Sequence, residues 1–371
     1  MKKYAFLLTC ILCNLLANAQ DFITRWDLSI TGSGATQLSF GVGTVGTCSY
    51  TWETIPAGNS GSGTFSGNTI TITGLPAGAM IRLLIDTTNF RRVHIKYGID
   101  KNRLKDIEQW GDVHWNNMDS AFAGCQNLNI TSIDTPDLSG VFTLNAMFKN
   151  CVALNGPSNI GSWNVSNVND MRSVFDGAKV FNQSVDSWNT SGVINMYRLF
   201  FGTDSFNQPL SNWDVSNVVD MSSLFFDAGS FNQPLGNWNT SNVIDMNYMF
   251  ADATSFNQPI GNWNTSNVTL MYNMFGNATA FNQALGNWNT SNVTNMRFMF
   301  CFATSFNQPI VNWNTSNVTD MEFMFSGASV FNQTIGNWNT SNVTNMTSMF
   351  EDAPSFNQPI ANWNISQVTG M

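Results

Sequence analysis

The 371-residue chain is short of charge. Charged side chains make up 11% of it, against roughly 25% in a typical soluble domain. Histidine occurs only twice, and the chain has no metalloprotease, serine-hydrolase or phosphate-loop motif. We therefore expect no enzyme activity, no cofactor and no metal ion. Hydrophobic residues still make up 43%, which is enough to bury a core.

Basic residues are scarce in the second half of the chain. From Trp163 to the end there are thirteen acidic and four basic side chains, whereas residues 1–162 are balanced, and the net charge is −9. An acidic surface repels phosphate groups, which argues against a nucleic-acid partner. The remaining polar surface must come from Asn, Ser, Thr and Gln, a composition that suits an extracellular repeat protein.

Long apolar runs are absent apart from one near the start. Lys2 and Lys3 precede an apolar run at residues 4–16, and Ala17-Asn18-Ala19 follows it. This is the layout of a secretory signal peptide, which we assign to residues 1–19. The run is too short to span a membrane, and no other stretch could do so. The mature chain is therefore predicted to be secreted or displayed on the cell surface, with no transmembrane segment.

Cysteine is scarce as well, with six copies. Cys10 and Cys13 lie in the predicted signal segment; a lipid anchor there is the rival interpretation, although neither follows the small residue that such anchoring prefers. Cys125 and Cys151 each lie three residues after a Phe, where later repeats usually have Ala. Stacked buried thiols are favoured over a disulfide, which secretion would permit. No Cys-x-x-Cys spacing supports a zinc site.

Residues 20–104 do not repeat. They read as short strands between Gly-rich turns, most clearly at residues 69–73 and 80–85, where Ile81, Leu83 and Ile85 share one face. We predict a small all-β, antiparallel sandwich-like domain. Two roles remain open for it: a cap on the first coil of the repeat array, or a separate adhesive or spacer module.

A 25-residue repeat fills the rest of the chain. Tryptophan recurs every 25 residues from Trp163 to Trp363, and the phenylalanine of Phe-Asn-Gln does so from Phe181 to Phe356. A fixed period in this range is typical of stacked coils that bury their apolar faces against each other. We place this array at residues 105–371. It ends mid-repeat at Met371, so we expect either that the chain continues, which we favour, or that another chain covers this edge.

Within one repeat the residues indicate a short helix and a short strand. The predicted helix begins after Ser291 as N-cap, and its apolar face has the spacing of two to three turns. That face consists of Val293, Met296, Met299, Phe300 and Ala303. Residues 306–310 contain Pro and fit a brief strand. Because strands lie about 4.8 Å apart and helices about 8–10 Å apart, the array must curve. The predicted class is α/β, a curved solenoid of strand–helix repeats with continuous Trp, Phe and Met ladders.

The repeat string resembles a known family. The consensus Phe-Asn-Gln-Pro-[Ile/Leu]-Gly-Asn-Trp-Asn-Thr-Ser-Asn-Val-Thr-x-Met-x-x-Met-Phe is similar to that of the BspA-type leucine-rich-repeat surface proteins of bacteria, over residues 107–371. The resemblance implies a right-handed leucine-rich-repeat-like solenoid on the cell surface, and some members of that family are linked to adhesion to host or matrix proteins and to other cells. It implies no enzyme activity.

Differences between the repeats point to candidate contact residues. Where the repeats agree, residues serve the fold, and where they differ, residues are free for another role. The two positions inside Met-x-x-Met vary most, and they are rich in the Tyr and Arg that dominate binding hot spots. The candidates are Tyr197, Arg198, Tyr248, Tyr272, Arg297, Phe298 and Phe323. The competing interpretation is drift at unselected surface sites, with aromatic rings packing sideways between coils.

Three functions remain open. The leading hypothesis is a secreted or cell-surface binding scaffold that adheres to an extracellular protein or glycan. The second is a purely structural spacer that presents another domain. The third is an enzyme centred on the N-terminal domain. The chain has only two histidines, His94 and His114, and no recognisable nucleophile–base pair, which argues against it, and we expect His114 to be structural. Stacked carboxylates such as Asp220 and Asp245 could hold calcium, but a solvated face explains them better.

Overall fold

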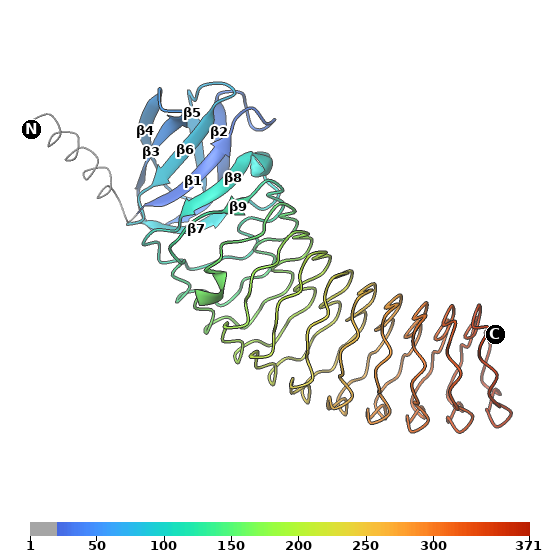
Figure 1. Cartoon of the computed structure of the whole chain (residues 1–371). Helices are drawn as coiled ribbons and strands as arrows, with labels where there is room; N and C mark the ends of the chain where they lie inside the picture. Colours follow the sequence, from blue (N-terminus) through green and yellow to red (C-terminus); the bar gives the residue numbers. More distant parts are fainter. Residues whose placement is uncertain (1–20) are drawn as a thin grey trace, which may run out of the picture.

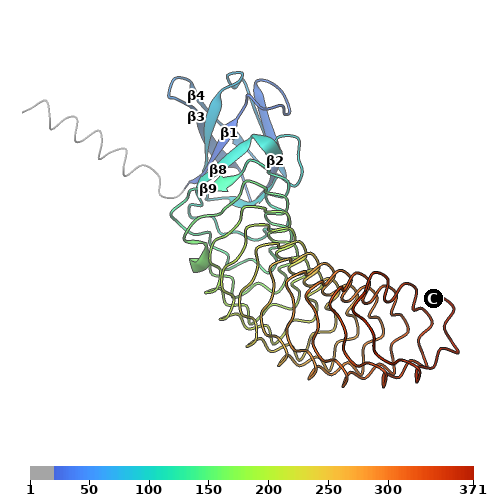
Figure 2. The ribbon, with the colours of Figure 1, turned by 45° about the vertical axis from the view of Figure 1, so that its right-hand side comes forward.

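The computed structural model describes residues 21–371, so the predicted signal peptide at residues 1–19 lies outside the described residues. A two-sheet unit is followed by a stack of coils that bends away from it, as Figure 1 and Figure 2 show. Within residues 21–371 no helix is long and apolar enough to cross a membrane. The elements are β1 (Phe22–Asp27), β2 (Gln37–Thr44), β3 (Cys48–Ile55), β4 (Ser60–Phe65), β5 (Thr69–Thr73), β6 (Met80–Ile85), β7 (Phe90–His94), η1 (Lys101–Arg103), β8 (Leu104–Gln109), β9 (Asn129–Ile130) and η2 (Ile160–Ser162).

The N-terminal unit consists of two sheets. One has the strand order β4-β3-β6-β1-β8-β9 and the other β5-β2-β7. The strands predicted at residues 69–73 and 80–85 are confirmed as β5 and β6. Ile81, Leu83 and Ile85 are fully buried, because alternate side chains of a strand point to the same face.

The six-stranded sheet continues into the coil array. β8 pairs in parallel with β9, which belongs to the first coil. The backbone N–H groups of Ile95 and Tyr97, just after β7, donate to the carbonyl oxygens of Ala121 and Ala123 at 2.8 Å each. The two-sheet unit therefore covers the edge of the first coil with hydrogen bonds.

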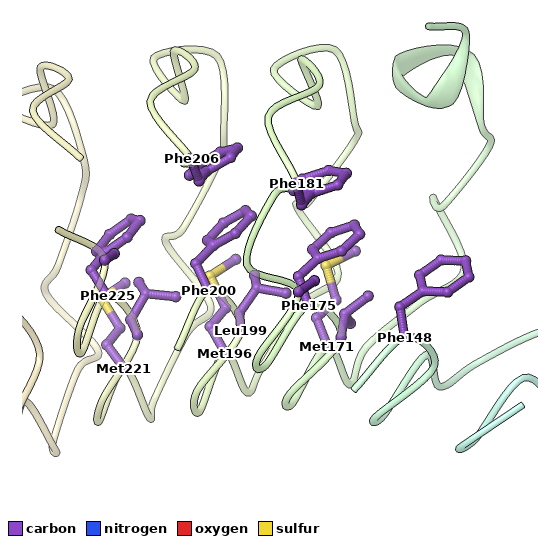
Figure 3. Close-up of a cluster of buried hydrophobic side chains, with 14 of the residues drawn as sticks. Phe148, Met171, Phe175, Phe181, Met196, Leu199, Phe200, Phe206, Met221 and Phe225 are labelled. Carbon is purple, nitrogen blue, oxygen red and sulfur yellow. The ribbon is translucent and has the colours of Figure 1, made fainter. Parts of the chain in front are cut away.

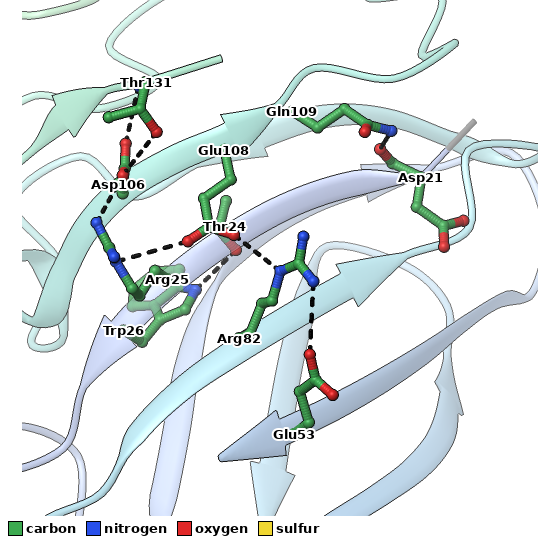
Figure 4. Close-up of polar contacts among 10 residues, drawn as sticks. All are labelled: Asp21, Thr24, Arg25, Trp26, Glu53, Arg82, Asp106, Glu108, Gln109 and Thr131. Atoms are coloured by element: carbon green, nitrogen blue, oxygen red, sulfur yellow. Dashed lines mark hydrogen bonds and ion pairs between the residues drawn. The ribbon is translucent and has the colours of Figure 1, made fainter. Parts of the chain in front are cut away.

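Side chains join the two parts in the same place. Asp106 of β8 accepts hydrogen bonds from the Arg25 guanidinium of β1 at 2.7 Å and from the Thr131 hydroxyl of the first coil at 2.9 Å (Figure 4). On the other face, the Phe22 ring packs edge-on against Trp115, with ring centroids 5.3 Å apart. One hydrophobic core runs from the sheets into the array.

The predicted strand–helix repeat is wrong. The described residues contain no α-helix; their regular secondary structure consists of strands in two sheets and two three-residue 3₁₀ helices. Where a helix was expected, the backbone N–H groups of Phe298, Phe300 and Phe302 donate to carbonyl oxygens of the next coil at 2.7–2.9 Å. The backbone N–H groups between them close tight turns; that of Met299, for example, donates to the Met296 carbonyl. In an α-helix each backbone N–H donates to the carbonyl four residues earlier. The N–H groups that donate to the next coil are not available for that pattern, so this segment is not helical.

The predicted strand and cap are also misplaced. Residues 306–310 form no strand; the coils are joined instead by single parallel bridges at the residue before the first Met of each Met-x-x-Met, for example Asn295 to Asp320. Ser291 caps no helix, and its backbone N–H donates to the Asn289 side chain at 3.0 Å in a local turn. The array bends, as Figure 1 shows, but the predicted cause, a wider spacing of helices than of strands, does not apply because the coils contain no helix.

The predicted ladders of buried side chains are confirmed. The indole of Trp288 lies parallel to those of Trp263 and Trp313, with ring centroids 6.3 and 6.4 Å away and planes within 3°. Phenylalanine forms a second ladder of paired rings, such as Phe200 and Phe206 at 4.1 Å (Figure 3). Methionines fill the space beside these rings (Figure 3), so each coil is buried by its neighbours rather than by itself.

Candidate binding surface

The side chains on which the repeats agree are used between coils. The Trp288 indole donates to the Ile260 carbonyl at 3.0 Å. The Thr290 hydroxyl donates to the Asn314 carbonyl at 3.0 Å, and the Asn292 amide donates to the Ser266 carbonyl at 2.7 Å. These bonds satisfy backbone groups that the irregular coil leaves without sheet partners. The agreeing positions serve the fold, as predicted.

The seven candidates from the Met-x-x-Met positions lie on the surface. Tyr197 is exposed, and the other six are half-buried: Arg198, Tyr248, Tyr272, Arg297, Phe298 and Phe323. The core is formed instead by the methionines on either side of them, such as Met296 and Met299. The variable pair therefore lies outside the buried Trp, Phe and Met ladders.

Six aromatic rings form a continuous line across the coils, which we call the aromatic row. It takes one residue from each of six successive coils: Phe201, Phe226, Tyr248, Tyr272, Phe298 and Phe323. Neighbouring ring centroids lie 4.6, 5.9, 4.7, 5.9 and 4.9 Å apart in that order. The rings thus pack sideways between coils, as the competing interpretation expected, and they do so while remaining partly exposed.

Two members of the row were not predicted. Phe201 and Phe226 lie just after the Leu-Phe pair of their coils, where other coils have small residues such as Ala251 and Gly276. Their ring planes are within 2° of parallel. Phe201 and Phe226 could have been found by the criterion that identified Tyr248, Tyr272, Phe298 and Phe323. Each is an aromatic residue at a position where the repeats differ.

Both candidate arginines are held by neighbours. The Arg198 guanidinium lies 3.4 Å from the Phe201 ring centroid and pairs with Asp176 at 2.8 Å. The Arg297 guanidinium lies 4.9 Å from the Phe298 ring centroid and pairs with Glu322 at 3.1 Å. Each arginine is therefore already neutralised within the array.

The backbone at the row disfavours large side chains. Tyr248, Phe298 and Phe323 have φ angles of +58°, +57° and +53°, a left-handed conformation that costs a bulky residue roughly 1 kcal/mol. Equivalent positions in other coils have Ser223 and Asn273, and Asn tolerates this conformation best. The fold does not require rings here.

Carboxylates flank the row. Asp245 lies three residues before Tyr248, and Asp252 lies four residues after it. Burial raises the pKa of Asp245, and the nearby Asp220 charge adds to this. Burial likewise raises the pKa of Asp227, as do its neighbours Asp204 and Asp252. Within the described residues, no group of three or more acidic, histidine or cysteine side chains is placed to hold a metal ion.

The tyrosines at the centre of the row are linked. Burial, together with the hydrogen bond and charge of Tyr272, raises the pKa of Tyr248 to about 12. The Tyr248 phenol therefore stays neutral at physiological pH. His114 lies far along the chain from this surface; it is largely exposed and contacts Asp137 at 2.6 Å.

A known protein family matches the array and the strands just before it. The family described as "Mycoplasma protein of unknown function, DUF285" matches residues 90–211, 200–300 and 271–371. The chain belongs to the DUF285 family. The first DUF285 match begins at Phe90, the start of β7, so it includes the strands that join the sheets to the first coil. The three overlapping matches identify DUF285 here as a repeat family. No curated protein and no solved structure matches the chain.

Proposed function

We propose that this protein is a secreted or cell-surface binding scaffold that adheres to an extracellular protein or glycan through the aromatic row. The single observation that carries the proposal is the row itself, six partly exposed rings in line. Binding hot spots are enriched in Trp, Tyr and Arg and cluster near the centre of an interface. Three of the six, Tyr248, Phe298 and Phe323, have left-handed backbone angles that Asn would adopt at lower cost, so the fold alone does not explain them.

Two further observations support this proposal. The first is the signal-peptide layout of residues 1–19, which favours export. The second is the likeness of the repeat string to the BspA-type surface proteins, some of which act in adhesion. Export is tested by fractionating cells that produce the full chain. We expect the protein in the medium or on the cell surface with Gln20 at its N-terminus, whereas an uncleaved chain inside the cell would contradict it.

Binding is tested with one variant and one matched control. Tyr248→Ser, Tyr272→Ser and Phe298→Ser together remove the centre of the row and introduce a residue type already present at these positions, as in Ser222 and Ser223. The control, Val180→Ser with Val330→Ser, removes two exposed apolar side chains elsewhere. Its positions also have Ser in most other coils, so neither variant should misfold.

The measurement is binding of the mature chain to a panel of immobilised matrix proteins and glycans. We expect the triple variant to lose more than about tenfold in affinity for whatever the wild type binds, because each hot-spot ring contributes more than about 1 kcal/mol. The control should bind as the wild type does, and the melting temperatures should be similar. Equal binding by the triple variant would contradict the proposal and favour a structural spacer.

A further inference from the structure

At both ends of the aromatic row the rings stack on each other, so the ring faces between them are covered. Phe201 lies between the Arg198 guanidinium, 3.4 Å from its centroid, and the parallel ring of Phe226 at 4.6 Å. Phe298 stacks on Phe323 at 4.9 Å and has Arg297 close by. A sugar binds an aromatic residue by packing on an open ring face. The stacked faces of Phe201, Phe226, Phe298 and Phe323 are therefore closed to a sugar, which makes apolar side chains the better fit to the row.

An aliphatic column lies on the same coils. Ile194, Val219 and Ile244 are 51%, 36% and 44% exposed. Five later coils have Thr at this position, from Thr269 to Thr369. Val219 and Ile244 line a shallow groove that crosses three coils, together with three asparagines. At this position, exposed Ile and Val therefore occur in the first three coils of the row and Thr in the later ones.

The same coils have more negative than positive charge, although Lys179 of the preceding coil pairs with Asp204 at 3.5 Å. Between Arg198 and Arg297 the chain has six aspartates and no lysine, arginine or histidine. The aspartates are Asp204, Asp214, Asp220, Asp227, Asp245 and Asp252. The raised pKa values of Asp227 and Asp245 have neighbouring carboxylates among their causes. A cationic group placed here would relieve this repulsion.

We propose that the coils between Ile194 and Phe298 bind an extended polypeptide segment that carries both basic and large apolar side chains. This inference rests on the proposed function and specifies the partner. The apolar side chains contact the ring edges and the aliphatic column, and the basic side chains pair with Asp220, Asp245 and Asp252. The five coils span about 20 Å at about 4.8 Å per coil, which an extended segment covers with about six residues at about 3.3 Å each.

The test uses three labelled peptides of about eight residues. One repeats Lys-Lys-Leu-Leu, so that each side of the extended chain presents both residue types; the others replace Lys by Glu or by Ser. Fluorescence anisotropy reports binding to the mature chain. We expect the lysine peptide to bind more tightly than the serine peptide, and the glutamate peptide to bind most weakly. Raising the salt from about 0.1 M to about 1 M, which shortens the Debye length from about 10 Å to about 3 Å, should reduce the difference.

Paired variants locate the charges. Asp245→Asn with Asp252→Asn removes the two carboxylates that flank Tyr248, and Asn occupies the same positions in other coils, as in Asn295 and Asn277. We expect this pair to weaken lysine-peptide binding about three- to tenfold. The control pair, Asp320→Asn with Asp352→Asn, makes the same change in net charge at the equivalent positions of coils outside the proposed site. It should leave the affinity unchanged.

The outcomes separate this inference from the proposed function. Equal binding of all three peptides, or equal weakening by both aspartate pairs, would overturn the charged-partner inference. If none of the peptides binds and a glycan on the panel binds in a way that depends on Tyr248, Tyr272 and Phe298, the polypeptide inference fails and the proposed function stands. If neither peptides nor panel members bind the wild type, both fail.

Discussion

The ring of Phe302 occupies the space that a β-carbon on Gly327, its counterpart in the next coil, would need. Both residues are in the left-handed region, with φ of +55° and +69°. Other coils fill this position only with Gly, Asn or Asp, residue types that tolerate such backbone angles. Phe302 is the exception, and it is 52% exposed. An exposed ring in one coil thus restricts the choice of residue in the next.

This pairing predicts a rescue. Gly327→Ala should lower the free energy of unfolding by about 2 kcal/mol, from the left-handed backbone and the displaced ring. Phe302→Asn combined with Gly327→Asn should be close to the wild type, because Asn277 occupies the same position. Urea unfolding followed by circular dichroism measures both. A Gly327→Ala variant as stable as the wild type would show that the ring moves aside freely.

The indole ladder predicts a gradient of stability along the array. Trp288→Phe removes the donor to the buried Ile260 carbonyl, and an unsatisfied buried acceptor costs about 1–3 kcal/mol. We expect a loss of about 2 kcal/mol in the free energy of unfolding. Trp363 makes the same bond to Ile335 at 3.1 Å but is only partly buried. In a protein that is produced to end at Met371, Trp363→Phe is the matched control and should cost less, because water can replace the lost donor. Equal losses would mean that the bond contributes little.

The cysteines predict a redox-inert protein. Cys125 and Cys151 are free and buried, and the Cys151 thiol donates to the Phe122 carbonyl at 3.1 Å. Burial raises the pKa of both thiols, and burial raises that of Cys301 to about 11. Because the thiolate is the reactive form, we expect no alkylation of the native protein by iodoacetamide at neutral pH.

Mass spectrometry checks this prediction in two conditions. Urea without a reductant should expose Cys48, Cys125, Cys151 and Cys301 to complete alkylation. If Cys125 and Cys151 instead react only after reduction, they form a disulfide and the stacked-thiol interpretation is wrong.

Much of the array was predictable from its period, but its local conformation was not. The in-register indoles of Trp263 and Trp288 follow from a constant interval of 25 residues. The helix was predicted because apolar residues at steps of three and one fit a helical face. Turns that alternate with bonds to the next coil give the same spacing. Residues such as Gly177 and Asn277, which favour left-handed backbone angles and recur at one position, were the evidence against a helix.

The candidate binding surface was also predicted only in part from the sequence. Variation between repeats identified Tyr248, Tyr272 and Phe298, which the structure brings together. It did not predict that Phe201 and Phe226 extend the same line. In its own coil, each of these two phenylalanines lies three residues after the position that Tyr248 occupies and four residues after the position that Tyr272 occupies. Only the geometry of the turns brings these different repeat positions next to each other, as Phe226 and Tyr248 show.

Asp245 predicts a stability that depends on pH in an unusual direction. Burial raises its pKa above the ordinary 3.8, the Asp220 carboxylate adds to this, and the Asn247 backbone N–H only partly offsets it. Between 3.8 and the raised value the folded state binds more protons than the unfolded state, so this group's contribution to stability falls as pH rises. At neutral pH the ionised Asp245 is therefore a cost to the folded array.

Asp245→Asn should raise the melting temperature slightly at neutral pH, and this advantage should vanish as the pH falls below 3.8. Asp214 is the matched control with the opposite sign, because the Ser216 hydroxyl and backbone N–H lower its pKa. Its contribution is present above 3.8 and is lost as pH falls, so Asp214→Asn should be neutral or slightly destabilising at pH 7 and equal to the wild type in acid. Melting temperatures of both variants and of the wild type, measured from neutral pH to below pH 3.8, test this prediction. An Asp245→Asn advantage that persists unchanged in acid would show that the carboxylate charge is not its source, and that the like charges of Asp220 and Asp245 are screened by solvent.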